Sequence, residues 1–230
     1  MIWLCFLFFI PFGFSIFKQR KIVKIFLKYN EPYSRNISGS RICTELLTLA
    51  NIHDVKILKR NSNFSNFSSS YENKIIFISK FVYDNSTISC LAVVARLIVY
   101  AAMDKKGHKL FSMFKKLMPL FNFLLIMGLS FLFIGIVFYS FGLINAGIPL
   151  FGLFLYFVYF AYLVYFLKLE KFVCVKSYEL LIKGGYIINE GENILAVLEA
   201  YKFFHIAEIP IFLATLLINT KAILFKKLKF

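Results

Sequence analysis

The chain has 230 residues, of which 60% are hydrophobic, and its mean hydropathy is +0.73. Soluble domains usually contain about 45–50% apolar residues, and here the excess is gathered in blocks, which indicates an integral membrane protein. The formal net charge of +15 comes largely from lysine and arginine clusters that adjoin these blocks. Such clusters are typical of cytoplasmic membrane edges and of contact with anionic headgroups, so we expect a lipid bilayer, and no nucleic acid, as partner.

The N-terminal segment is predicted to be a membrane anchor over residues 1–17. Residues 2–17 carry no charge and precede the basic sequence KQRK, whereas a signal peptide has its charge before its apolar region. This order predicts an uncleaved anchor with the N-terminus outside and the chain from residue 18 in the cytoplasm. The segment is short for a span and contains Pro11, so a re-entrant or interfacial segment is the alternative.

Residues 18–116 have the mixed pattern of a small α+β domain. Four apolar residues of its first helix recur at helical spacing: Ile42, Leu46, Leu49 and Ala50. In chain order the elements we expect are a helix over 38–52, strands over 54–59 and 74–79 with a polar loop over 60–70 between them, and an apolar helix over 88–103.

The second half of the chain predicts a transmembrane hairpin over residues 117–167. These residues carry no charge, and the segment is long enough for two spans of about 20 residues each. Residues 142–149 have the composition of the turn between the spans. Lysines flank both ends, so both ends are expected in the cytoplasm. Residues 168–202 are predicted to form a cytoplasmic segment of two helices, and 203–230 a membrane-associated helix with a basic tail. The fold class is therefore an α-helical membrane protein with three to four membrane segments.

Arg96 stands in the middle of the apolar stretch 88–103. A lone guanidinium at the centre of a bilayer costs roughly 2.5 kcal/mol or more, so Arg96 either lies outside the lipid or has a specific partner. The residues alone also allow an ordinary buried helix with one snorkelling arginine. No histidine among His53, His108 and His205 has the spacing of a metal-binding helix. The four cysteines are scattered, form no CxxC pair, and fit a reducing compartment.

The order of the segments resembles the YugP-type neutral zinc metallopeptidases of bacterial membranes. That family has an anchor, a "TGxEVA" helix, a strand, a "DHYDP" loop, an "LSxxVY" segment, a zinc helix with two histidines and a glutamate, a membrane hairpin, and a "PVEFxASRRA" helix. The segments of this chain that carry the resemblance are SGSRICTELL (38–47), DVKILK (54–59), ISKFVYDNSTIS (78–89), KLEKFVCVKSYELL (168–181) and NILAVLEAYKFF (193–204).

The resemblance places the family's zinc site on residues that cannot perform its chemistry. The first histidine falls on Arg96, the general-base glutamate on Leu97 and the second histidine on Tyr100, while Glu170 matches the family's glutamate. Arginine cannot lose its proton to bind a metal, leucine cannot activate water, and tyrosine is a poor zinc ligand. FSSSY (67–71) stands in place of the "DHYDP" loop. The chain therefore resembles a degenerate member of the family that has lost its zinc and needs no cofactor.

Two expectations follow for these four positions. Leu97 should be buried, and Arg96 should take over the charge of the metal by pairing with Glu170, with Tyr100 adding a hydrogen bond. Pairing of Arg96 with Asp104, or exposure to solvent, is the alternative.

The function that this implies is a pseudopeptidase that binds or scaffolds a membrane-protein partner from the cytoplasmic side of the cell membrane, without peptidase activity. A hydrolase with a rebuilt site is the first alternative. A small membrane transport component is the second, although 117–167 offer few polar groups to line a path.

Overall fold

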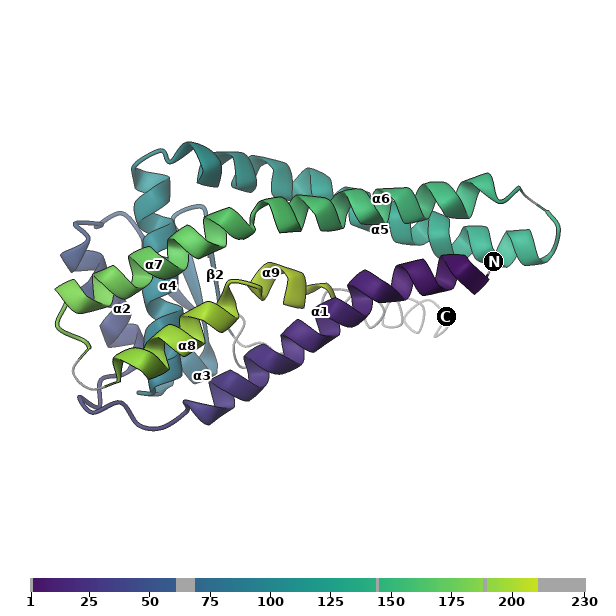
Figure 1. The fold of residues 1–230 in the computed structure, drawn as a ribbon. Helices are drawn as coiled ribbons and strands as arrows, with labels where there is room; N and C mark the ends of the chain where they lie inside the picture. The colour runs from purple at the N-terminus through teal and green to yellow at the C-terminus, as the bar shows by residue number, and fades with distance from the viewer. Residues whose placement is uncertain (1, 61–68, 144, 188–189, 211–230) are drawn as a thin grey trace, which may run out of the picture. The chain divides into compact units, whose positions relative to one another are not determined.

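Figure 1 shows the computed structural model, which describes residues 2–60, 69–143, 145–187 and 190–210. In chain order the elements are α1 (Ile2–Lys28), α2 (Gly39–Leu49), β1 (Lys56–Arg60), β2 (Ser70–Glu72), β3 (Ile75–Ser79), α3 (Lys80–Asp84), α4 (Ile88–Lys105), α5 (Lys109–Ser140), α6 (Gly147–Tyr165), α7 (Leu167–Lys183), α8 (Gly191–Tyr201) and α9 (Phe204–Ala207).

The described residues form two compact units. The hairpin unit is made from the described parts of Met1–Arg20, Leu117–Tyr165 and Phe204–Phe230, and the helix–sheet unit from those of Lys21–Lys116 and Phe166–Phe203. The helix–sheet unit is therefore discontinuous in sequence, since the two long apolar helices lie between its halves.

A three-stranded sheet with the order β1-β3-β2 lies in the helix–sheet unit. β1 pairs with β3 in parallel, and β2 pairs with β3 antiparallel. Ile76 and Ile78 of the central strand β3 are fully buried, whereas β1 at the edge is mostly exposed. Among the three strands of the described sheet, the central one therefore contributes most to the core.

The helix α4 forms the centre of the helix–sheet unit, with α2, α7 and α8 packed around it. Its first turn is capped by Thr87, whose hydroxyl accepts a hydrogen bond from the backbone of Cys90. Most of its length is buried, from Ile88 to Met103, and a helix that is apolar all round is typical of a protein core. This confirms that the apolar stretch around Arg96 is a buried helix of a compact domain.

The loop after α1 joins the start of this unit to its end. The Tyr33 hydroxyl donates to the carbonyl of Tyr186 at 2.8 Å, and the Arg35 guanidinium donates to the carbonyl of Gly185 at 2.7 Å. The Tyr186 hydroxyl in turn donates to the Glu45 carboxylate of α2, which lowers the pKa of that carboxyl. These bonds hold the turn after α7 against residues about 150 positions earlier.

A close approach of α2 and α3 depends on a glycine. A Cβ atom at Gly39 would lie 2.0 Å from the carbonyl oxygen of Val82, and real Cβ atoms do not approach so closely. Any side chain at residue 39 would therefore push α2 away from α3.

In the hairpin unit, α5 and α6 approach through small residues. A Cβ atom at Gly152 would lie 2.4 Å from the backbone nitrogen of Leu132 and 2.6 Å from the carbonyl oxygen of Gly128. Nearby, the rings of Phe121 and Tyr162 stack with centroids 3.8 Å apart. Small residues at such contacts are characteristic of helices that pair in membranes.

Two helical stretches in the described part of the chain are long and apolar enough to cross a membrane, judged by length and composition: Lys109–Ser140 and Gly147–Lys183. The two spans of the predicted hairpin lie within these two stretches. Phe166 separates the second stretch into α6 and α7. The predicted anchor forms the first part of α1, although side chains before Leu7 are not described. Most of the predicted C-terminal helix, residues 211–230, lies outside the described residues.

Three local predictions differ from the structure. Ser70 and Tyr71, expected in a loop, belong to strand β2, where Tyr71 pairs with Ile76. Leu49, expected on the buried face of the first helix, is 46% exposed, because α2 buries Cys43 and Leu47 beside Ile42 and Leu46 instead. The predicted turn is shorter than 142–149, because α6 already begins at Gly147.

Candidate functional site

The ion pair between Arg96 and Glu170 joins α4 to α7 inside the helix–sheet unit. The Arg96 guanidinium donates from Nη2 to Glu170 Oε2 at 2.7 Å, and the two side chains are only 4% and 3% exposed. Both helices are placed by their apolar faces, since α4 is buried along its length and α7 buries Leu169 and Val173 beside the glutamate. The predicted partner of the buried arginine is therefore confirmed.

Tyr100 completes this cluster one helical turn after Arg96. Its hydroxyl accepts a hydrogen bond from Arg96 Nη2 at 3.0 Å and donates one to Glu170 Oε1. The three side chains thus close a ring in which each contacts the other two. The further hydrogen bond expected from Tyr100 is confirmed as well.

The charges of the cluster balance in a site that water does not reach. Burial is the largest single influence on the pKa of Arg96 and lowers it, but the charge and hydrogen bond of Glu170, together with Tyr100 and Cys174, raise it by more in sum, so the pKa of Arg96 lies above its usual value. Burial and the negative charge of Glu170 raise the pKa of Tyr100 well above its usual value, although Arg96 opposes this. Glu170 also lies in the first turn of α7, where the helix dipole stabilises a carboxylate.

Tyr201 of α8 is a member of the site that the sequence analysis did not identify. Its ring centroid lies 5.3 Å from Arg96 Cζ, and the Tyr100 ring lies at 5.4 Å, so two aromatic rings flank the guanidinium. Aromatic faces attract arginine more strongly when water is excluded. Nothing in the spacing of Tyr201 within the chain signals this contact, because it depends on how α8 packs against α4.

Leu97 is buried, and Asp104 has partners other than Arg96. Leu97 is 2% exposed, so its predicted burial is confirmed. Asp104, the alternative partner of Arg96, instead accepts a hydrogen bond from Tyr71 at 2.7 Å and lies 3.2 Å from the Lys115 ammonium. The structure therefore separates the two possible partners.

The residues of the cluster do not fit a zinc ion. Zinc sites use deprotonated thiolates, neutral imidazoles and carboxylates, and Glu170 is the one such group within the hydrogen-bonded ring. The nearby thiol of Cys174 keeps its proton, since burial raises its pKa to about 11, and it donates to the carbonyl of Leu198. Arg96 is a permanent cation, Tyr100 keeps its proton, and Leu97 has no donor atom. Across the described residues no group of three or more histidine, cysteine, aspartate or glutamate side chains is placed to hold a metal. His53 is exposed, and His108 and His205 are half-buried.

A comparison with family models shows the family of the chain. Residues 4–221 match the family model described as "Putative neutral zinc metallopeptidase". The chain belongs to this family. Comparisons with curated proteins and with solved structures found no match. A neutral zinc metallopeptidase relative thus carries a buried salt bridge on the helix that the sequence resemblance aligns with the family's zinc helix.

Proposed function

We propose that this member of the neutral zinc metallopeptidase family is a pseudopeptidase, a membrane protein that keeps the scaffold and has exchanged the metal site for a salt bridge. The observation that carries the proposal is the ring of Arg96, Tyr100 and Glu170. A buried carboxylate without a compensating cation is strongly unfavourable, and Arg96 supplies that cation permanently. The guanidinium already binds Oε2 of Glu170, an oxygen that would otherwise be available to a metal ion.

The proposed role of such a scaffold is to bind another membrane protein. Its support is the two helices that are long and apolar enough to cross a membrane, together with the basic clusters beside them, which favour a helix–sheet unit on the cytoplasmic side of the cell membrane. Affinity purification of the full chain in mild detergent, compared with an unrelated membrane protein of similar size, should recover a recurrent membrane-protein partner. Recovery of the chain alone from its native membrane would contradict this role.

Metal content tests the loss of the zinc site directly. Protein purified without chelators should contain far less than one zinc per chain by inductively coupled plasma mass spectrometry. The matched comparison is the triple variant Arg96→His/Leu97→Glu/Tyr100→His, which places two imidazoles one turn apart on α4 beside Glu170 and should gain zinc. Stoichiometric zinc in the unaltered protein would refute the pseudopeptidase and favour a hydrolase with a rebuilt site.

A further inference from the structure

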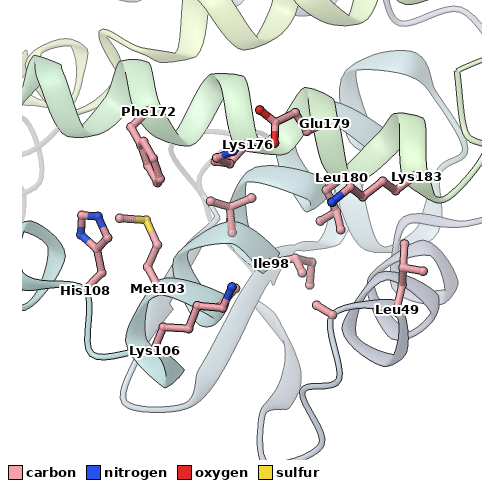
Figure 2. Close-up of a pocket in the computed structure, with 13 residues that line it drawn as sticks. Leu49, Ile98, Met103, Lys106, His108, Phe172, Lys176, Glu179, Leu180 and Lys183 are labelled. Carbon is pink, nitrogen blue, oxygen red and sulfur yellow. Dashed lines mark hydrogen bonds and ion pairs between the residues drawn. The ribbon is translucent and has the colours of Figure 1, made fainter.

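A groove separate from the salt-bridge cluster opens between α4 and α7, beside the end of α2. It has a volume of about 430 Å³, and Figure 2 shows side chains from all three helices around it. Ile98, Met103 and Leu180 supply its apolar walls, and Phe172 stands at one end beside His108, with the two rings 5.3 Å apart. Small-molecule sites have volumes of about 300–1,000 Å³, mostly apolar walls and a few charged groups.

Apolar side chains at this groove remain in contact with water. Phe172 is 39% exposed and Leu49, at the opposite end, is 46% exposed. From Phe172 to Lys183 the wall of α7 is about 16 Å long, at about 1.5 Å per helical residue. The groove is thus long and narrow, and a ligand lying along it would remove both exposed side chains from water.

The rim of the groove is positively charged. Lys106 follows α4 and Lys183 ends α7, and both are exposed. Within the described part of the chain neither lysine lies in an ion pair, whereas Lys176 between them is already neutralised by Glu179 at 2.6 Å. In Figure 2 Lys106 rises from one wall and Lys183 from the other. An occupant with an apolar body and a negative group would complement both features.

We propose that this groove binds a single-chain anionic amphiphile, with its acyl chain along Ile98, Met103 and Leu180 and its carboxylate attracted by the positive charge of the rim lysines Lys106 and Lys183. The volume favours this occupant over a peptide helix. A helix is about 10 Å wide, so its body would remain outside a groove of about 430 Å³. An acyl chain, by contrast, would enter fully.

Photocrosslinking with dodecanoate that carries a terminal diazirine tests the proposal on the full chain in phosphatidylcholine nanodiscs. Mass spectrometry should place the crosslinks on the groove segments of α4 and α7. The double variant Lys106→Glu/Lys183→Glu should reduce labelling several-fold, while labelling by the corresponding uncharged alcohol should persist. The matched control Lys56→Glu/Lys80→Glu makes the same change of charge at two exposed lysines outside the groove and should have no effect.

A second variant and a third probe make the outcome decisive. Ala102→Phe fills the groove and should reduce labelling by both the carboxylate and the alcohol, with unchanged circular dichroism as the check that the variant folds. Equal labelling by the amine analogue, insensitivity to Lys106→Glu/Lys183→Glu, or crosslinks spread evenly over the apolar helices would overturn the proposal. Groove labelling that appears only after removal of a co-purifying protein would assign the groove to that protein instead. These labelling results do not depend on the zinc content of the protein, so they test the groove separately from the proposed loss of the zinc site.

Discussion

Arg96 of α4 and Glu170 of α7 are 74 positions apart in the sequence, and their side chains meet at 2.7 Å with almost no exposure to water. Removing one partner would leave the other as an uncompensated buried charge. The pair therefore ties the two halves of the helix–sheet unit by a contact that neither half satisfies alone.

A double-mutant cycle measures this coupling. We expect Arg96→Ala or Glu170→Ala to lower the free energy of unfolding by about 3–5 kcal/mol, and the double variant to lose far less than the sum. Chemical unfolding in detergent, followed by circular dichroism, is the measurement. The control is Lys59→Ala, whose ion pair with Asp84 is 38% and 44% exposed and should contribute about 1 kcal/mol or less. Additive losses at Arg96 and Glu170 would show that the pair is not a unit.

Leu97 is expected to act as a packing residue. Because it is 2% exposed, Leu97→Ala should lower the free energy of unfolding by about 2–5 kcal/mol through the lost contacts and the cavity left behind. Leu58, which is 44% exposed on β1, provides the control, and Leu58→Ala should change stability little. Leu97→Glu should yield no peptidase activity, and proteolysis by this single variant would contradict the proposed function.

The close contact of α5 and α6 predicts a strong effect of size at Gly152. A valine there would force its side chain into the backbone of Leu132 and Gly128, so we expect Gly152→Val to separate the two helices and lower the unfolding temperature of the protein in detergent. Gly147 begins the same helix, and a Cβ atom there would meet nothing within 4 Å. Gly147→Ala should therefore leave the unfolding temperature nearly unchanged. Equal effects at the two glycines would argue against the close helix contact.

The buried thiols should resist alkylation in the folded protein. Burial raises the pKa of Cys43 to about 12 and those of Cys90 and Cys174 to about 11, so the reactive thiolate is scarce at neutral pH. Labelling with maleimide at pH 7.5 should be slow at these three positions and rapid after denaturation. The contrary result would be rapid modification of any of the three in folded protein.

The topology of the proposed hairpin is tested with single cysteines at exposed positions. Asn145→Cys lies between α5 and α6, and Arg60→Cys lies at the end of β1. In sealed vesicles an impermeant maleimide should reach these two positions from opposite sides, since both ends of the hairpin are expected in the cytoplasm. Labelling of both from one side would refute the hairpin as a pair of spans.

Much of the candidate site could be predicted from the sequence because charge is expensive to bury. Arg96 in an apolar helix indicated a specific partner, with exposure to solvent as the alternative, and Glu170 was the carboxylate that the family resemblance placed on the helix after the hairpin. The hydroxyl of Tyr100 followed from its position one turn along α4. Tyr201 could not be predicted in the same way, because the position of an aromatic residue in the sequence does not indicate that its ring will contact an arginine on another helix.

The parts that the sequence did not predict depend on packing between elements. At α2, the predicted buried face with Leu49 and the observed buried face with Cys43 and Leu47 both have helical spacing. The packing of α2 on α4 decides which of the two faces is buried. Strand β2 has three residues and gains its hydrogen bonds from β3, so its own sequence signals little. The groove beside α7 likewise exists only once the helices have met.

The contacts of Tyr33 and Arg35 with the turn at Tyr186 and Gly185 have a consequence for biosynthesis. A ribosome makes residues 33 and 35 long before residues 185 and 186, and the long apolar helices α5 and α6 are translated in between. The early half of the helix–sheet unit must therefore wait, with α4 lacking its neighbours α7 and α8, until translation has passed the hairpin. During that interval the apolar surface of α4 is available to chaperones, and release of the chain before residue 166 would leave a product that cannot complete its core.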